Sequence, residues 1–160
     1  MRVLVAGATG QLGVDLVNLL RCRGVDVAAP NAQRLDLLRP QTVRDAVHDA
    51  RPHWVINCAA YTAVDNCETD RDAAWRVNAD GPRNIGEIAM KHGSRVIHVS
   101  TDYVFDGKKK VPNPYIEDDP VNPLSEYGRS KLAGEQLLQA SCPNALMLRT
   151  AWLYSANGPN

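Results

Sequence analysis

Short apolar runs alternate along the chain with longer stretches in which apolar residues recur every three or four positions. The first run is Arg-Val-Leu-Val-Ala at residues 2–6, and comparable runs occupy residues 25–29, 54–57, 95–99 and 145–149. Apolar runs of this length are typical of strands that are buried on both faces of a parallel sheet. The pattern therefore predicts five strands with helices between them.

Helices are expected over residues 11–23 and 40–50, from a capping box at Thr69 and Asp72 to Lys91, and from Asn122-Pro123 to about residue 140. The periodicity also predicts which side chains of the first two helices face the sheet. They are Leu12, Leu16, Leu19 and Leu20 in the first helix and Val43, Ala46 and Val47 in the second.

Strands that alternate with helices predict an α/β fold, a doubly wound parallel sheet of the Rossmann type with strand order 3-2-1-4-5. The length of 160 residues indicates one domain, residues 1–160. In such sheets ligands bind beyond the carboxyl ends of the strands, where the strand order reverses. The residues that follow the strands are therefore the candidates for chemistry.

Composition and charge exclude several classes of partner. The 18 basic and 18 acidic residues balance, so neither nucleic acid nor a membrane surface is expected as a partner. No apolar run approaches the length of about 18 residues that a membrane span requires, and the glycines interrupt any signal sequence, so we expect a cytoplasmic protein. The cysteines are scattered, and no metal site is expected from Cys22, Cys58, Cys67 and Cys142.

Three glycines, Gly7, Gly10 and Gly13, separate the first strand from the first helix. In a dinucleotide-binding turn the first glycine permits the sharp bend, the second lets backbone approach a pyrophosphate, and the third lets the helix pack against the sheet. The helix N-terminus at Gln11 and Leu12 would then offer free N–H groups to the phosphates. The alternative interpretation is a tight turn with a purely structural role.

The second strand ends at Pro30-Asn31, without the carboxylate that normally binds the adenosine ribose. Arg34 lies close enough in sequence to attract a 2′-phosphate, so we expect NADPH as the cofactor and leave NADH open. Other expected cofactor contacts are Asp36 and Leu37 beside the adenine, and the small residues Ala59 and Ala60 at the end of the third strand.

Tyr127 and Lys131 are four residues apart, which places both side chains on one face of a helix. A lysine beside a phenol favours the phenolate, and a tyrosine tuned in this way can exchange a proton with a substrate oxygen. Thr101 adds a hydroxyl from the end of the fourth strand. Tyr-x-x-x-Lys alone is common on exposed helices, but together with the glycine turn it indicates carbonyl reduction or alcohol oxidation.

Two polar features have alternative interpretations. Asn78 lies among apolar residues, and its amide either bonds to backbone or holds a water or orients Lys131. The run Lys108–Lys110 is most simply a solvated loop tip, and a contact with a nucleotide diphosphate is the less favoured alternative.

The chain resembles the extended short-chain dehydrogenase/reductase family and, more narrowly, its dTDP-4-dehydrorhamnose reductases. The most specific stretches are Ser-Thr-Asp-Tyr-Val-Phe at residues 100–105 and Tyr-Gly-Arg-Ser-Lys-Leu-Ala-Gly-Glu at residues 127–135. The resemblance implies Thr101, Tyr127 and Lys131 as catalytic residues, with Tyr127 and Lys131 also on the cofactor. By the same resemblance, Tyr61 and Asn78 are expected near the cofactor, and Val64, Asp102, Tyr103 and Trp152 near the sugar.

This resemblance implies reduction of a dTDP-linked 4-keto sugar with NADPH or NADH, and it leaves a homodimer open. The alternatives are another nucleotide-sugar epimerase or dehydratase, or a non-catalytic regulatory subunit similar to methionine adenosyltransferase β. Thr101 is followed by Asp102 and Tyr103 rather than by the acidic pair usual in dehydratases, which counts against that class. Family members continue into a smaller substrate lobe, so we expect this chain to be the N-terminal portion of a longer enzyme and inactive alone.

Overall fold

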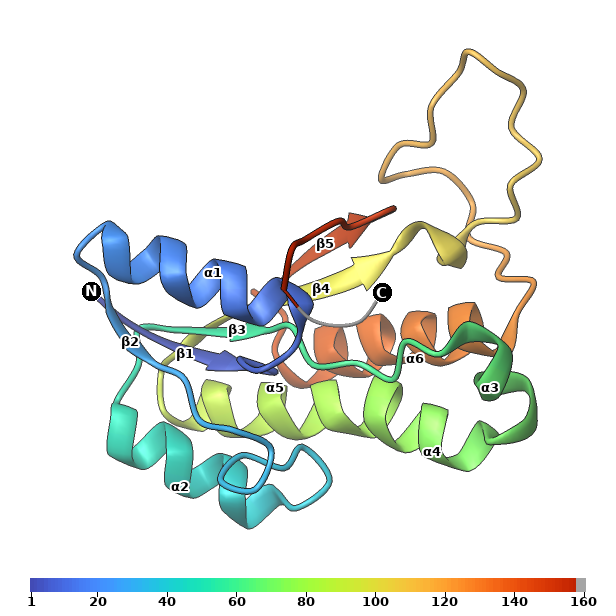
Figure 1. Ribbon diagram of the computed structural model, residues 1–160. Coiled ribbons are helices and arrows are strands. Elements are labelled where there is room, and N and C mark those ends of the chain that lie inside the picture. Colours follow the sequence, from blue (N-terminus) through green and yellow to red (C-terminus); the bar gives the residue numbers. More distant parts are fainter. Residues whose placement is uncertain (158–160) are drawn as a thin grey trace.

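The structure is a computed structural model that describes residues 1–157, and it places a five-stranded sheet between two layers of helices (Figure 1). The strands are β1 (Arg2–Ala6), β2 (Asp26–Ala28), β3 (Trp54–Asn57), β4 (Arg95–Thr101) and β5 (Leu146–Thr150). The α-helices are α1 (Gln11–Cys22), α2 (Pro40–Ala50), α3 (Val64–Thr69), α4 (Arg71–Trp75), α5 (Gly81–Lys91) and α6 (Glu126–Ser141). A π-helical turn, Arg76–Asp80, joins α4 to α5, and a 3₁₀ turn, Asp102–Val104, follows β4.

The sheet is parallel throughout, and this confirms the predicted α/β architecture. The predicted strand order 3-2-1-4-5 is wrong, because the observed order is 2-1-3-4-5. The reason is the position of α2, which packs on β1 and α5 through Val43 and Val47. The chain that leaves α2 therefore emerges beyond β1, where β3 pairs directly with it, Val3 opposite Trp54.

Alternate residues of β1 face two different hydrophobic clusters, as a strand buried on both faces requires. Val3 and Val5 pack with Val17 of α1 on one side of the sheet. Leu4 and Ala6 face the opposite side, in a larger cluster with residues of α2, α5 and α6. Figure 1 shows this arrangement, with α1 on one side of the sheet and α2, α5 and α6 on the other.

One face of β4 and β5 has no helix over it within the described residues. Leu146 and Leu148 point to this face and are 52% and 50% exposed. Leucines at alternate positions of a parallel strand are normally covered on both sides. This bare apolar face lies beside α1, on the side of the sheet that α1 only partly covers (Figure 1).

Several helix details differ from the predictions. Leu19 was expected on the apolar face of α1 but is 53% exposed, and Val17 is buried instead. The Thr69–Asp72 capping box is also wrong, because Thr69 ends α3, a short helix that the periodicity did not predict, and no side chain caps α4. The last helix begins at Glu126, after Pro123, with Ser125 as its N-cap. None of the helices in residues 1–157 is both long and apolar enough to cross a membrane.

Candidate active site

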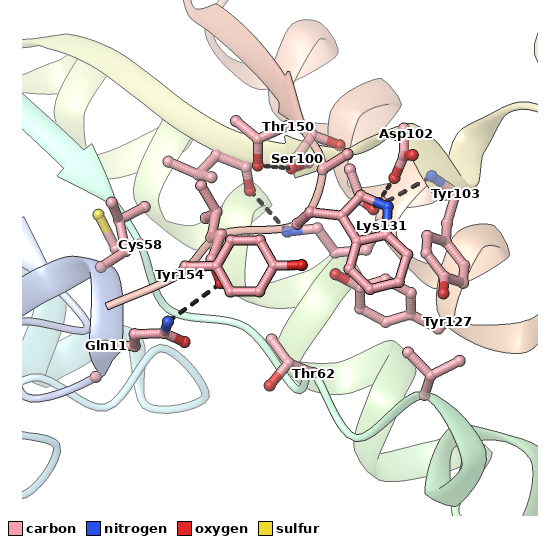
Figure 2. A pocket seen from close by; sticks show the side chains of 18 residues that line it. Gln11, Cys58, Thr62, Ser100, Asp102, Tyr103, Tyr127, Lys131, Thr150 and Tyr154 are labelled. Carbon is pink, nitrogen blue, oxygen red and sulfur yellow. Dashed lines mark hydrogen bonds between the residues drawn. The ribbon is translucent and has the colours of Figure 1, made fainter. Parts of the chain in front are cut away.

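The carboxyl ends of β3, β4 and β5 and the glycine turn after β1 surround one hollow of about 580 Å³, within the usual size range of small-molecule sites. Figure 2 shows its lining side chains. The lining residues that the sequence predicted are Gly10, Gln11, Leu12, Val64, Thr101, Asp102, Tyr103, Tyr127, Lys131 and Trp152. The two halves of the prediction, the glycine turn and the Thr-Tyr-Lys set, therefore share one hollow.

Other lining residues were not predicted individually. They are Cys58, Thr62, Val99, Ser100, Thr150, Ala151, Leu153 and Tyr154. The rule that ligands gather at the carboxyl ends of parallel strands points to the segment after β5, but no motif marks its members apart from Trp152. Burial raises the pKa of the Cys58 thiol to about 11, so this thiol is protonated at neutral pH. Among the described residues, no group of His, Cys, Asp and Glu side chains is placed to hold a metal ion.

Helix α6 carries Tyr127 and Lys131 into the hollow. Its N-terminus is fixed by Ser125, whose Oγ accepts a hydrogen bond from the Gly128 N–H at 3.1 Å. Tyr127 is buried, and its ring meets the ring of Tyr103 edge to face with centroids 5.5 Å apart. The tyrosine therefore has a fixed position before any ligand binds.

Lys131 is among the most deeply buried side chains, with 1% of its surface exposed. Its Nζ donates a hydrogen bond to the Val99 carbonyl at 2.8 Å. Burial lowers the pKa of Lys131 to about 8, and the carboxylate of Glu135 opposes this lowering. Lys131 is therefore mostly charged at neutral pH but holds its proton less firmly than a surface lysine does.

The expectation that Lys131 lowers the pKa of Tyr127 is wrong. Burial raises the pKa of Tyr127, and the opposing effect comes from the Thr101 hydroxyl rather than from Lys131. Although the two side chains share a helix face, the ammonium group of Lys131 is directed to the β4 backbone instead. Tyr127 is therefore a protonated phenol at neutral pH, which suits a group that gives a proton away.

Thr101 ends β4 and is 5% exposed. Its Oγ1 accepts a hydrogen bond from the Tyr103 N–H at 3.2 Å, so it caps the 3₁₀ turn that carries Asp102 and Tyr103. The same hydroxyl lies 3.3 Å from Asp102 Oδ1. The end of β4 and this turn thus bring Thr101 and Tyr103 against Tyr127 at the start of α6.

The glycine turn fits a phosphate group. A Cβ on Gly13 would lie 2.0 Å from the Gly7 carbonyl oxygen, so α1 packs on the turn only because residue 13 is glycine. At Gly10 the nearest atom to an added Cβ is 3.5 Å away, so nothing inside the chain requires a glycine there. Gly10 borders the hollow, and no side chain caps the α1 N-terminus, which leaves its first N–H groups available to an anion.

Ala59, Ala60 and Tyr61 follow β3 but do not line the hollow. Ala59 packs against the core and against Gly7, whereas Tyr61 joins a small cluster with Cys67, Ala74 and Tyr127. The predicted cofactor contacts at these three positions stay predictions. The structure gives them a role in supporting the walls of the hollow.

The structure supports the first interpretation of Asn78, in which its buried amide bonds to backbone. Its Oδ1 accepts from the Tyr61 N–H at 2.8 Å, and its Nδ2 lies 3.0 Å from both the Tyr61 carbonyl and Ser130 Oγ. Ser130 Oγ in turn donates to the Tyr127 carbonyl at 2.8 Å. Asn78 therefore ties the segment after β3 to the first turns of α6, and it does not border the hollow.

The residues expected near the adenosine lie outside the hollow. Arg34 is exposed, in a turn whose N–H is bonded to Asn31. Asp36 accepts a hydrogen bond from the Leu38 N–H, which lowers the pKa of Asp36, and Leu37 is buried in the core. Leu37 thus packs inward, and of these residues Arg34 is the one free to meet a phosphate from outside.

An ion pair between buried Glu135 and half-buried Arg149, which the sequence did not indicate, holds α6 against the sheet. Glu135 accepts hydrogen bonds from Nε and Nη2 of Arg149 on β5, at 3.0 and 2.7 Å, and from Ser100 Oγ on β4. The Arg149 guanidinium also lies over the Phe105 ring, 5.1 Å from its centroid. This cluster fixes the helix that carries Tyr127 and Lys131 relative to the strand that carries Thr101.

Comparison with known proteins gives consistent matches over the whole chain. Residues 1–160 match the family described as RmlD substrate binding domain. A probable dTDP-4,6-dihydroxy-2-methyloxan-3-one 4-ketoreductase of Streptomyces antibioticus is 48% identical over 99% of this chain and 53% of its own length. A dTDP-4-dehydrorhamnose reductase of Streptomyces griseus is 44% identical over 99% of this chain and 52% of its own length.

A solved structure has the same fold. The dTDP-4-dehydrorhamnose reductase of Bacillus anthracis, in complex with NADP, superposes with a TM-score of 0.94 and 39% identity, over 99% of this chain and 56% of that one. The chain therefore spans about half the length of the relatives that it matches.

Proposed function

Because the chain belongs to the RmlD substrate binding domain family, we propose that it forms the cofactor-binding and catalytic part of a dTDP-4-dehydrorhamnose reductase. The proposed reaction is the NADPH- or NADH-dependent reduction of the 4-keto group of dTDP-4-dehydro-6-deoxy-L-mannose, which gives dTDP-L-rhamnose. The observation that carries the proposal is the meeting of Tyr127, Lys131 and Thr101 with the uncapped N-terminus of α1 around one hollow.

We propose that residues 1–160 are a Rossmann-type domain and that further chain completes the sugar site. Two observations support this. The relatives are about twice as long as the part that the chain matches, and the face of β4 and β5 that carries Leu146 and Leu148 is bare. A bare face of this kind fits a site whose remaining wall comes from further chain.

The chain's own residues would hold a dinucleotide at two places. The first-turn N–H groups of α1, with Gly10 beside them, would bind the pyrophosphate. Lys131 would bind the nicotinamide ribose, because Lys131 lines the hollow and its hydrogen bond to the Val99 carbonyl uses only one of the ammonium protons. When bound, the cofactor would supply the hydride that the carbonyl carbon receives.

Tyr127 would give its proton to the carbonyl oxygen of the sugar. Its raised pKa keeps the phenol protonated at neutral pH, and an alkoxide is a far stronger base than a phenolate, so the transfer is downhill. The phenolate that remains would be stabilised by a hydrogen bond from the Thr101 hydroxyl. Thr101 is already fixed by its bond to the Tyr103 N–H, so this stabilisation requires no rearrangement of the strand end.

A second candidate substrate is another dTDP-linked 4-keto sugar. The relative with 48% identity is named for the reduction of such a sugar, and its identity to this chain exceeds that of the rhamnose-pathway relative from Streptomyces griseus. The chemistry at Tyr127 would be the same for both. The distinction would come from residues near the sugar, among which Tyr103 and Trp152 are 47% and 81% exposed.

The test is the substitution Tyr127→Phe in the complete protein, with Tyr103→Phe as the matched control. The Tyr127 variant keeps the ring that packs on Tyr103, so folding and NADPH binding should survive, while the reduction rate should fall by about 10²–10⁴-fold. The control also loses one phenol from the same hollow but should keep its proton donor. Steady-state reduction of the 4-keto sugar, paired with fluorescence titration of NADPH, measures both. A Tyr127→Phe variant that kept more than about a tenth of the original rate would refute the assignment.

A further inference from the structure

The segment after β5, residues 151–157, crosses back over the rim of the sheet to reach α1, and we name it the strap. Two side-chain hydrogen bonds tie it there. Gln11 Nε2 donates to the Leu153 carbonyl at 3.2 Å, and Asn157 Nδ2 donates to Asp15 Oδ1 at 2.6 Å. Gln11 and Asp15 are four residues apart on α1, so one face of this helix holds both contacts.

The strap forms a wall of the hollow. Its residues 151–154 border the same space as Gly10, Gln11 and Lys131. In Figure 2 the Tyr154 ring lies across the middle of this space, with Gln11 on one side and Lys131 on the other. A molecule that spans from the glycine turn to Lys131 would therefore lie against the strap.

The strap is held by these ties rather than by packing. It contains no helix or strand within the described residues, and its aromatic side chains Trp152 and Tyr154 are 81% and 75% exposed. Trp152 has a φ of 52°, a backbone conformation that residues other than glycine adopt rarely and that is often retained at functional sites. Large aromatic rings with so little cover gain buried area when a ligand lies against them.

We propose that the strap closes over the bound cofactor and that the hydrogen bond between Asp15 and Asn157 is its latch. This inference rests on the proposed function, because it takes the nicotinamide dinucleotide as the molecule that the strap covers. Asp15 is then a positioning residue. It touches neither cofactor nor substrate, and it acts by holding the segment that encloses them.

The test exchanges the latch partners in the complete protein. Asn157→Asp places a second carboxylate opposite Asp15, so the two should repel each other and open the strap. The double variant Asp15→Asn with Asn157→Asp restores one amide donor and one carboxylate acceptor in reversed positions. Asn18→Asp is the matched control, since Asn18 is exposed on α1 close to Asp15.

The measured quantity is the rate of NADPH dissociation, followed by stopped-flow fluorescence, with the thermal midpoint of each variant recorded alongside. Asn157→Asp should raise this rate about tenfold, which corresponds to about 1.4 kcal/mol. The double variant should return it to within about twofold of the original, and Asn18→Asp should leave it unchanged. If Asp15 had only a structural role, Asn157→Asp would change the thermal midpoint, and the double variant would not restore the dissociation rate.

Two negative results are distinguishable. Binding of NADPH by the unchanged protein, with equal dissociation rates for Asn157→Asp and the control, would overturn the latch and leave the proposed function standing. Failure of the unchanged protein to bind NADPH or NADH at all would overturn both proposals together.

Discussion

Replacement of Glu135 by glutamine should destabilise the chain by about 3 kcal/mol. The carboxylate is 5% exposed and receives hydrogen bonds from two nitrogens of Arg149 and from the Ser100 hydroxyl. A glutamine has nearly the same shape, but it has no charge and turns an amide donor toward groups that are themselves donors. The change therefore leaves Arg149 without its counter-charge and at least one buried donor without a partner.

The magnitude follows from the burial of Glu135 and the partial burial of Arg149. Removal of one member of a buried ion pair typically costs about 3–5 kcal/mol. The side chain of Arg149 is 24% exposed, so water can partly replace the lost contacts, and the lower end of that range applies. A loss of this size is a large fraction of the stability of an ordinary domain, which is about 5–15 kcal/mol.

Urea unfolding followed by tryptophan fluorescence gives the free energy of unfolding directly. Glu87→Gln is the matched control, because Glu87 is exposed on α5 and the same substitution there should change stability by less than about 0.5 kcal/mol. If Glu135→Gln cost no more than this control, the ion pair would not be what fixes α6 on the sheet. The positioning of Tyr127 and Lys131 would then need another explanation.

Two further outcomes are expected. Burial lowers the pKa of Lys131 from 10.5 to about 8, so the unfolded chain binds the extra proton between these pH values. The free energy of unfolding should therefore rise with pH across this window, by up to about 3 kcal/mol, relative to a Lys131→Met variant in which this contribution is absent. Urea unfolding of both proteins at a series of pH values from 7 to 10 measures the difference, and parallel curves would contradict it. Arg34→Ala should raise the KM for NADPH more than the KM for NADH, and equal changes in steady-state assays would count against a phosphate contact.

The parts of the site that depend on local chemistry could be predicted from the sequence. Gly7, Gly10 and Gly13 have distinct steric requirements at a fixed spacing, and Tyr127 and Lys131 share a helix face by geometry alone. Both features survive any arrangement of the sheet, because each is built within a single turn or helix. The residues at two ends of the hollow, the glycine turn and the Tyr127–Lys131 pair, could therefore be predicted from the sequence.

The features that depend on tertiary packing were not predictable in this way. The strand order depends on where α2 comes to rest, and an apolar face with Val43 and Val47 fits either side of β1 equally well in the sequence pattern. The pKa of Tyr127 depends on its burial and on the Thr101 hydroxyl, and a four-residue spacing between Tyr127 and Lys131 records neither. The Glu135–Arg149 pair joins residues whose roles become visible only when α6 lies beside β5.

The strap shows a related limit. Asp15 and Asn157 are far apart in the chain and belong to no motif, and each residue type is common on protein surfaces. The segment after β5 comes to lie against α1 only when the sheet has formed. A contact of this kind has no signal in a single sequence.

The π-helical turn at Arg76–Asp80 constrains how this protein can evolve. A π turn holds one residue more than an α turn, so deletion of a single residue there would convert it to an α turn and leave α4 and α5 nearly in register. Asn78 lies within this turn, so the same deletion would move its amide and break its hydrogen bonds to the Tyr61 backbone. Descendants of this sequence can therefore exchange side chains along the helix one at a time, whereas loss of a residue from the turn would release the segment after β3 from α6 in a single step.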